Sequence, residues 1–260
     1  MDQNIKSAAS QLRQAMNEMT PCAPIRSNIA HDLDQAYQIQ QINHAIRLQN
    51  GAKLVGRKIG LTAPSVQKQL GVDQPDFGML YHDMEILHGH EVPWNKCILP
   101  KAEVEIAFVL GQNLDQDNLT SHSIISAVDY VLPCIEIVDS RIENWDINIL
   151  DTIADNASAS FYVLGHSPKR LDQIDILSCT MQMHKNNELV SEGKSSACMH
   201  SPINAMLWLA KTMKTAGLPL QKGDVILSGA LGPVIDAQPE DHFSATISSL
   251  GSVEVKFGKK

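Results

Sequence analysis

The segment from Pro100 to Leu110 has the pattern of a β-strand, but it carries charge among apolar residues. Glu103 and Glu105 lie two residues apart, so in a strand their carboxylates point to the same side, about 6.6 Å apart along the chain. Two carboxylates side by side on an apolar strand repel each other unless water or a cation compensates. Taken alone, the pattern favours an edge strand with solvated carboxylates over a site for an oxygen-preferring cation such as Mg²⁺ or Mn²⁺.

A second apolar segment shifts that interpretation towards a metal. Residues 131–141 predict another strand, and Glu136 lies inside its apolar run. Three carboxylates on two apolar strands are difficult to explain as solvated edges, and they indicate a metal site. In the same segment Asp139 and Arg141 are close enough along the chain to pair, and we expect a local ion pair between them.

Two further charged residues are candidates for catalysis. Lys58 lies inside the predicted strand 54–61, where a lysine either reaches the strand edge or points into a pocket. Asp76 lies in the segment 72–80, which Pro75 and a glycine predict to be a turn-rich loop. Asp76 is therefore either a turn carboxylate or a catalytic one.

Length and composition limit the class of protein. The 260 residues are 43% hydrophobic and 19% charged, which is typical of a globular protein. The net charge is −8 with scattered basic residues, so nucleic acid and anionic membranes are not expected partners. Five cysteines without a C-x-x-C motif predict free, buried thiols in a reducing compartment. No transmembrane run or signal peptide is apparent, and we expect a cytoplasmic protein.

Hydrophobic periodicity and turn residues predict a mixture of helices and strands. Helices are expected over 5–19, 32–49, 63–70, 122–130 and 203–216. Further strands are expected over 161–165, 243–248 and 252–257, in a hairpin over 179–190, and at 223–227 before a Gly-rich turn. Residues 151–160 are dense in small polar side chains and predict a loop.

Six segments carry long motifs in order along the chain: Gly56–Thr62, Leu70–Gly78, Pro100–Phe108, Ile135–Ile142, Asp151–Ser158 and Ser228–Pro233. Together they resemble the 2-keto-4-pentenoate hydratases, which belong to the fumarylacetoacetate hydrolase superfamily. The resemblance runs from about Ala36 to Phe257. One departure is visible at His200, where relatives usually have a glycine before the proline that opens a helix.

The resemblance implies an α+β fold, a mixed β-sheet roll with flanking helices. Residues 1–51 would form a helical segment packed on a catalytic domain, 52–260. It also implies a homo-oligomer that uses Mg²⁺ or Mn²⁺. The metal ligands it implies are Glu103, Glu105 and Glu136. The catalytic residues it implies are Lys58 and Asp76, and the substrate-binding residues are Asn156, Ser158, Gly229, Ala230, Leu231 and Gly232.

The activity implied is that of a hydro-lyase in the meta-cleavage degradation of aromatic compounds. It would add water to a small 2-hydroxy-2,4-dienoate and give a 4-hydroxy-2-oxo acid. One alternative is a 2-oxo-3-enedioate (4-oxalocrotonate-type) decarboxylase, which tends toward Lys-Met-Gly-Leu-Thr and Pro-Ile-Tyr-Gly where this chain has Lys58–Thr62 and Pro75–Gly78. These segments favour the hydratase. The other alternative is a non-catalytic partner subunit, against which the complete set of site residues argues. A complex with a downstream aldolase or a sister decarboxylase is compatible with the resemblance.

Overall fold

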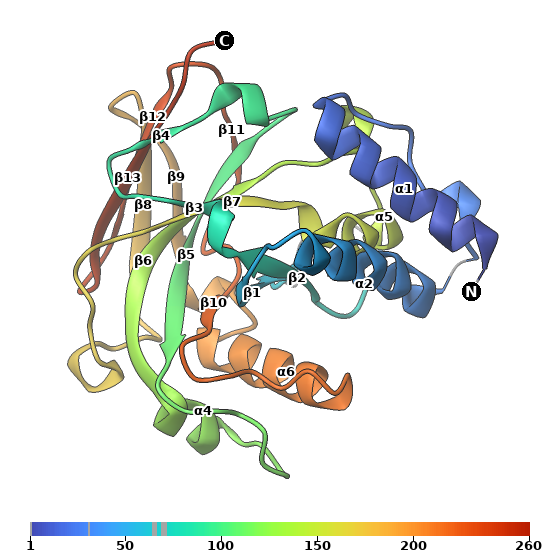
Figure 1. Ribbon diagram of the computed structural model, residues 1–260. Helices are drawn as coiled ribbons and strands as arrows, with labels where there is room; N and C mark the ends of the chain where they lie inside the picture. The colour runs from blue at the N-terminus through green and yellow to red at the C-terminus, as the bar shows by residue number, and fades with distance from the viewer. Residues whose placement is uncertain (1, 31, 64–66, 69–71) are drawn as a thin grey trace.

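Two β-sheets with helices on one side and at one end make up the computed structural model, which describes residues 2–30, 32–63, 67–68 and 72–260 (Figure 1). The α-helices are α1 (Gln3–Glu18), α2 (Leu33–Gln49), α4 (Ser121–Ala127), α5 (Ile149–Ala154) and α6 (Pro202–Thr215). Short 3₁₀ turns are η1 (Arg26–Asn28), η2 (His82–Met84), η3 (Trp94–Lys96), η4 (Glu143–Trp145), η5 (Asn156–Ser158), η6 (Leu171–Gln173) and η7 (Ser195–Ala197). Among the described residues, no helix combines the length and the apolar character needed to cross a bilayer.

The larger sheet has the strand order β2-β1-β10-β5-β6-β7-β3, with β11 paired to β5, and the smaller has the order β4-β13-β12-β8-β9. Both sheets mix parallel and antiparallel pairs, since β1 runs parallel to β10 and β13 parallel to β4. The strands are β1 (Leu54–Gly60), β2 (Asp76–Tyr81), β3 (Glu85–Ile86), β4 (Glu91–Val92), β5 (Lys101–Leu110), β6 (Val128–Val138), β7 (Ala159–Leu164), β8 (Thr180–Lys185), β9 (Glu188–Lys194), β10 (Val225–Leu227), β11 (Ile235–Asp236), β12 (His242–Ile247) and β13 (Gly251–Phe257).

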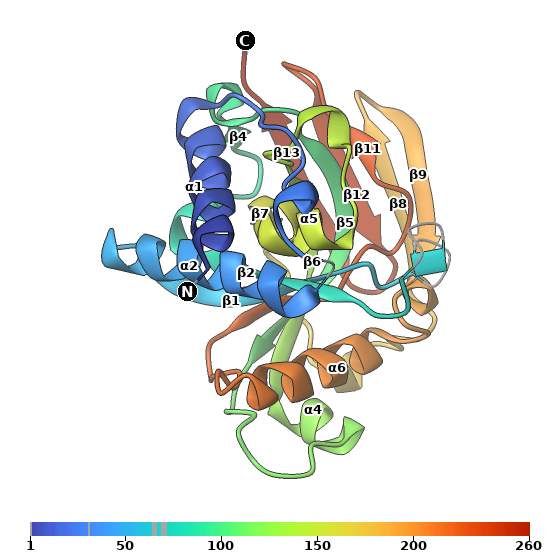
Figure 2. The same cartoon turned by 90° about the vertical axis from the view of Figure 1, so that its right-hand side faces the viewer.

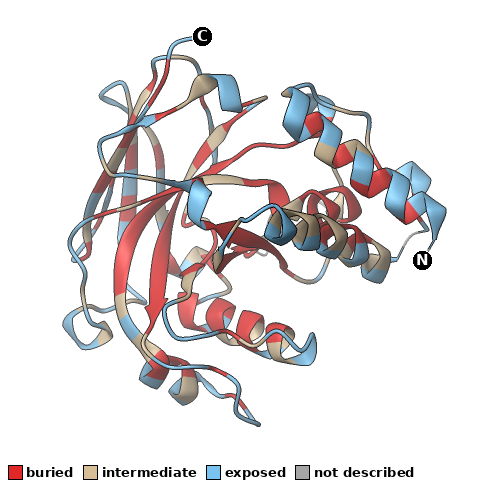
Figure 3. Ribbon diagram, viewed as in Figure 1, coloured by how far each residue is buried: buried red, intermediate tan, exposed pale blue. Residues whose placement is uncertain are grey.

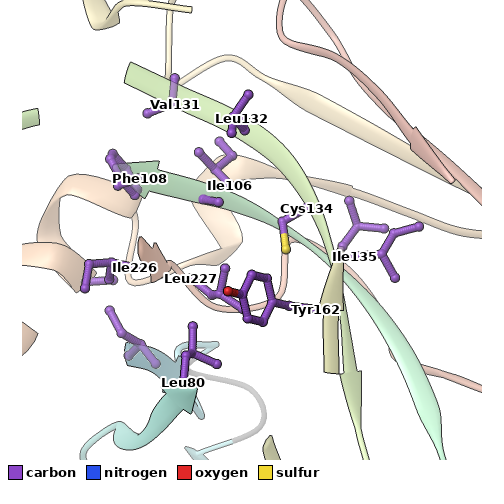
Figure 4. Packing of buried hydrophobic residues seen from close by; sticks show 14 of the residues in the cluster. Leu80, Ile106, Phe108, Val131, Leu132, Cys134, Ile135, Tyr162, Ile226 and Leu227 are labelled. Carbon is purple, nitrogen blue, oxygen red and sulfur yellow. The ribbon is translucent and has the colours of Figure 1, made fainter. Parts of the chain in front are cut away.

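Strands β5 and β6 are the centre of the core. Almost all of their residues are buried on both faces, as the red ribbons of Figure 3 show. Phe108 of β5 and Ile135 of β6 contribute to the cluster of Figure 4, with Tyr162 of β7 and Leu227 of β10. The smaller sheet packs on β6 through β12 and β13. Removal of this apolar surface from water stabilises the pairing of the two long strands.

Helix α2 packs on α5 at one side of the larger sheet, and α1 packs on α2 (Figure 2). Helix α1 presents the buried face that its periodicity predicts, and Ile5 and Leu12 share a satellite core with Ile39 and Ile153. Asp32 caps α2 by accepting the backbone N–H of Asp34, as expected. The helix expected over 63–70 falls largely on residues outside the described ranges.

Several sequence predictions of elements are confirmed by the structure. The β8–β9 hairpin turns at Asn186 and Asn187, both of which have positive φ, as a two-residue hairpin turn requires. Helix α6 and the closing strands β12 and β13 begin and end within two residues of their predicted limits. The mixed sheets with flanking helices confirm the α+β fold class.

The loop predicted over 72–80 is wrong, because Asp76 to Tyr81 form the buried strand β2, paired with β1. Gly78 suggested a turn, but it serves close packing instead. A Cβ atom at this position would lie 2.3 Å from the carbonyl oxygen of Asn156. Only glycine allows that approach, and the neighbour that demands it is remote in sequence.

Two further predicted boundaries are wrong. The helix expected over 122–130 ends at Ala127, because residues 128–130 pair with β5 at the start of β6. The loop expected over 151–160 begins as helix α5, which Asn148 caps by accepting the N–H groups of Leu150 and Asp151. Pairing with β5 ends the first helix early, and the Asn148 cap starts the second one. Local composition does not distinguish helix from strand or loop at these two places.

The ion pair expected between Asp139 and Arg141 is also wrong. The buried Arg141 guanidinium pairs with Asp155, with 2.5 Å between Arg141 Nε and Asp155 Oδ1. The Asp139 carboxylate instead accepts the backbone N–H groups of Ile98 and Leu99, each at 2.7 Å. The Arg141–Asp155 pair therefore ties the end of β6 to the end of α5.

We expect Asp155→Asn to destabilise the fold by about 3 kcal/mol, because it leaves the buried Arg141 guanidinium without a counter-charge. Urea unfolding at pH 7 measures the change. The matched control is Asp172→Asn, which breaks the Arg170–Asp172 pair, whose side chains are 69% and 71% exposed. That change should cost less than about 0.5 kcal/mol. Equal effects of the two substitutions would contradict the structural role of the buried pair.

Candidate active site

Strands β5 and β6 bring three glutamates onto one face of the larger sheet. Glu103 lies directly opposite Glu136 in the antiparallel register, and Glu105 follows two residues along β5. Directly opposed residues of an antiparallel pair share a face, as do residues two apart on one strand. One carboxylate oxygen from each of the three lies within 4.8 Å of the others. The structure therefore brings together the carboxylates that the sequence analysis grouped.

The three carboxylates are poorly compensated by the protein. Glu105 and Glu136 are fully buried, and the Glu105 Oε2 atom accepts the backbone N–H of Gly229 at 2.7 Å. Glu105 Oε1 and both Glu136 oxygens have no hydrogen-bond partner among the described residues. Buried carboxylate oxygens without donors are costly, and a small divalent cation satisfies several of them at once.

Burial and charge repulsion both favour the protonated forms of Glu105 and Glu136 in the metal-free protein. Burial, with the charges of Glu136 and Glu103, holds the pKa of Glu105 well above its ordinary value. Burial raises the pKa of Glu136 to about 8, although Lys58 lowers it. A bound cation reverses this preference, because it stabilises the ionised form of each ligand.

Lys58 reaches the same face from β1. Its Nζ atom lies 3.4 Å from Glu136 Oε1, a distance at which charge attraction matters although hydrogen-bond geometry is lacking. Burial alone would lower the pKa of this lysine, but Glu136 and the other carboxylates outweigh burial and raise the pKa. The ionised carboxylates therefore favour the ammonium form of Lys58.

Asp76 lies at the start of β2, opposite Gly60 of β1. Its carboxyl group is fully buried, and neither oxygen accepts a hydrogen bond of good geometry from the described residues. Burial raises the pKa of Asp76 to about 6, against the opposing effect of Lys58. A Cβ atom on Gly60 would lie 2.1 Å from Asp76 Oδ1, so glycine at position 60 makes room for the carboxylate.

The Gly-rich turn after β10 closes over the glutamates. Gly229 has a φ of +104°, and a Cβ atom there would lie 2.2 Å from Thr62 Oγ1. The positive φ and the close approach to Thr62 both require glycine at position 229. In this conformation the N–H of Gly229 donates to Glu105. The Leu231 N–H donates to the Val104 carbonyl oxygen, which anchors the turn to β5.

A cavity of about 900 Å³ opens above this cluster. It is lined mainly by apolar atoms, and its charged lining residues include Lys58, Asp76 and Glu103. Most of the expected site residues line it, namely Lys58, Asp76, Glu103, Ser158, Ala230, Leu231 and Gly232. The Ser158 hydroxyl is buried and has no hydrogen-bond partner in the described part of the chain. The cavity has the shape and polarity of a small-molecule site.

Asn156 is placed differently from the expectation that it binds substrate. It does not line the cavity, and its side-chain amide is already engaged by one residue of β2. Oδ1 accepts the Met79 N–H at 2.7 Å, and Nδ2 donates to the Met79 carbonyl oxygen at 2.9 Å. The amide therefore acts as a clamp between η5 and β2.

The sequence analysis missed other residues that line the cavity, among them Thr62, Lys101, Trp145 and Lys194. A signal for Lys101 existed, since it precedes Glu103 by two residues and must share its strand face. Trp145 lies in η4, outside the predicted strands, and Lys194 lies at the end of β9 in the smaller sheet, so no local pattern identifies them. His200, the departure from the family pattern, is exposed with a φ of +65° and lies in the turn before α6, outside the cavity lining.

The chain is similar to a known protein family and to named enzymes. Residues 48–257 match the family described as fumarylacetoacetate (FAA) hydrolase C-terminal. The chain is 48% identical over 253 residues to "2-keto-4-pentenoate hydratase 1" of Dechloromonas aromatica (strain RCB), covering 97% of this chain and 96% of the relative. It is 37% identical to a 2-hydroxyhexa-2,4-dienoate hydratase of Comamonas testosteroni, over 98% of both chains.

Among solved structures, the chain is similar to 4-oxalocrotonate decarboxylase from Pseudomonas putida G7, complexed with magnesium and adipate. The TM-score is 0.93 at 28% identity, and the match covers 97% of each chain. Fumarylpyruvate hydrolase from Pseudomonas aeruginosa has the same fold at 11% identity, with a TM-score of 0.65 over 79% of this chain and 90% of the other. With nearly full-length identity of 48% to named hydratases, the chain belongs to the 2-keto-4-pentenoate hydratase family of the fumarylacetoacetate hydrolase superfamily.

Proposed function

We propose that the protein is a metal-dependent hydro-lyase. It adds water to a 2-hydroxy-2,4-dienoate of the 2-oxopent-4-enoate type and gives a 4-hydroxy-2-oxo acid, a reaction of the meta-cleavage degradation of aromatic compounds. The observation that carries the proposal is the 48% identity, over almost the whole of both chains, to 2-keto-4-pentenoate hydratases. The cavity above a cluster of buried carboxylates supports it.

Glu103, Glu105 and Glu136 are the proposed ligands of a divalent cation, Mg²⁺ or Mn²⁺. If these three groups and Asp76 are all ionised beside a protonated Lys58, the formal charge is −3, four negative charges against one positive. A dication offsets most of that charge, and carboxylate oxygens are the ligands that Mg²⁺ and Mn²⁺ prefer. When bound, the cation supplies stabilisation of the negative charge that develops on the 2-oxygen of the substrate.

Lys58 and Asp76 are the proposed groups that act on the substrate. The Lys58 ammonium can hold the substrate carboxylate or deliver a proton. The Asp76 carboxyl, with a pKa of about 6, can gain and lose a proton near neutral pH. In the overall reaction the 2-hydroxyl group of the dienol loses its proton and C5 gains one, which gives the α,β-unsaturated ketone. Hydroxide from water then bonds to C4, and C3 takes the remaining proton.

The rest of the cavity is proposed to orient the substrate. The Ser158 hydroxyl, which lacks a partner in the described residues, can donate to a substrate oxygen. Ala230, Leu231 and Gly232 form a wall beside it. The apolar lining excludes water from the reacting carbons except where polar groups hold it, which strengthens every charge interaction at the site.

A decarboxylase of 2-oxo-3-enedioates is the second candidate, favoured by the TM-score of 0.93 to 4-oxalocrotonate decarboxylase. Identity argues for the hydratase, at 48% against 28%. Lys58–Thr62 and Pro75–Gly78 also follow the hydratase pattern rather than that of the decarboxylases.

We also propose the organisation and assembly that the family resemblance implies. Residues 1–51 form a helical segment packed on a catalytic domain, 52–260, and the contacts of α2 with α5, with the core that α1 shares with both, support this arrangement. A homo-oligomer in the cytoplasm, able to associate with a downstream aldolase or a sister decarboxylase, completes the proposal. Light scattering of the purified protein, alone and mixed with such an enzyme, tests both associations.

The activity is tested with freshly generated 2-hydroxypenta-2,4-dienoate, whose ultraviolet absorbance should decay when Mg²⁺ is present. The expected product is 4-hydroxy-2-oxopentanoate, and EDTA should stop the decay. Release of CO₂ from a 2-oxohex-3-enedioate, without hydration of the dienoate, would instead establish the decarboxylase. Absence of both reactions in the metal-loaded protein would contradict both assignments.

Asp76→Asn should lower kcat by about 10²- to 10⁴-fold, because the amide cannot transfer the proton that the carboxyl carries. Its Mn²⁺ dissociation constant should stay close to that of the wild type, since Asp76 is not among the proposed ligands. Glu105→Gln should lose both Mn²⁺ binding and metal-dependent turnover while the protein stays folded. Electron paramagnetic resonance titration with Mn²⁺ separates the two, and equal metal affinities in both variants would refute the ligand assignment.

The stability of the metal-free protein should fall as pH rises from 5 to 8. The unfolded chain loses the Glu136 proton near the ordinary pKa of 4.5, whereas the folded protein keeps it until about pH 8. The unfolded state therefore binds fewer protons in this window, and stability falls by up to about 1.4 kcal/mol per pH unit. Urea unfolding in EDTA measures this slope.

Glu136→Gln should reduce the slope, whereas the exposed Glu188→Gln control should leave it unchanged. Added Mg²⁺ should stabilise the wild type more at pH 8 than at pH 6, because the metal competes with the proton for the carboxylate. A slope in Glu136→Gln equal to that of the wild type would show that the buried glutamate is not its source.

A further inference from the structure

Gln40 of α2 connects two segments that border the cavity. Its side chain is 2% exposed, and its Nε2 atom donates to the Phe77 carbonyl oxygen at 2.8 Å and to the Ile153 carbonyl oxygen at 3.1 Å. Phe77 lies in β2 and Ile153 in α5, so a single amide group links two elements that are remote in sequence. Both carbonyl groups lie in the interior, where an oxygen that loses its donor is costly.

Each of the two linked residues lies close to a group of the proposed active site. Phe77 directly follows Asp76 on β2. Ile153 lies near the end of α5, which continues into η5 and Ser158. A shift of either carbonyl group would therefore move a side chain that lines the cavity.

The η5 turn depends on outside support, because its backbone is unusual. Asn156, Ala157 and Ser158 have φ angles of 56°, 51° and 55°, so three consecutive non-glycine residues adopt the left-handed conformation. Such a turn persists only where surrounding contacts hold it. The Asn156 amide supplies two of them by its bonds to Met79, and Gln40 supports the helix that leads into the turn.

A second contact from α2 acts on the same residue of β2. The ring of Tyr37, three residues before Gln40, stacks on the ring of Phe77 with centroids 4.6 Å apart and an interplanar angle of 16°. Residues three apart share a helix face, so the stacking and the hydrogen bond act together. Helix α2 thus restrains Phe77 through both its side chain and its backbone.

We infer that Gln40 is a positioning residue that sets the placement of Asp76 relative to Ser158 across the cavity. This inference rests on the proposed function, because it assigns Gln40 to the support of the proton-transferring Asp76. The family match begins at residue 48, so Gln40 belongs to the helical segment that precedes it. That segment then contributes to catalysis as well as to stability, although it holds none of the residues that contact substrate.

The test replaces Gln40 with Met, an unbranched side chain that lacks donors. The Gln38→Met variant is the matched control, since Gln38 is exposed on the same helix. Gln40→Met should lower kcat for the dienoate by about 10- to 100-fold, because small displacements of a reacting group cost rate steeply. KM and the Mn²⁺ dissociation constant should change by less than about threefold, because the glutamates stay in place. Gln40→Leu is measured alongside as a second donor-free variant in case one of them folds poorly.

A double-mutant cycle separates positioning from general loss of structure. In an Asp76→Asn background, Gln40→Met should lower the remaining rate no further, because the group that it positions no longer acts. Hydrogen exchange at 25 °C should be faster in β2 and η5 of Gln40→Met, but not of Gln38→Met.

Two results would overturn the inference: a kcat for Gln40→Met equal to that of Gln38→Met, or losses that multiply fully with Asp76→Asn. Absence of hydration by the wild type would instead reject the proposed function. In that case, unchanged hydrogen exchange in β2 and η5 of Gln40→Met would also reject the structural link that Gln40 makes between β2 and α5. Faster hydrogen exchange there would support this structural link but no role in catalysis.

Discussion

Repulsion among three carboxylates, two of them fully buried, is the constraint on which the rest of the site depends. Glu103, Glu105 and Glu136 share one face of a strand pair, and the surrounding protein offers them few donors. The pairing of β5 with β6, buried on both faces, holds them together against that repulsion. A core with less apolar surface would let the two strands separate, and separation of the carboxylates would lower the affinity for a cation.

Close approach of backbone is the second recurring feature. Gly60 makes room for Asp76, Gly78 admits the Asn156 carbonyl group, and Gly229 brings its N–H to Glu105. At each position a side chain would meet an atom at 2.3 Å or less. Glycine at these three positions therefore allows close packing around the site. This close packing leaves little freedom of movement for the charged side chains.

The glutamates could be predicted from sequence because their signal is local. Period-two alternation places Glu103 with Glu105, and an apolar run around Glu136 marks a second interior strand. Strand β2 and the Arg141–Asp155 pair could not be predicted in the same way. Gly78 is required by the carbonyl group of Asn156, which lies far along the chain. Arg141 pairs with Asp155 although the carboxylate of Asp139 is nearer in the sequence. Both features depend on contacts between residues that are not neighbours in the sequence, and such contacts produce no periodic pattern from which they could be predicted.

The order of the strands has a consequence for biosynthesis. β5 and β6 are neighbours in the chain, so the three glutamates can meet early through a hairpin-like pairing. β10 inserts between β1 and β5, and therefore β1 cannot take its place in the sheet until residue 227 has been synthesised. Contacts between segments so distant form slowly. The nascent chain thus holds the carboxylates before it can supply the Gly229 N–H or fix Lys58, and the site is completed only after the segment that follows residue 227 has been synthesised.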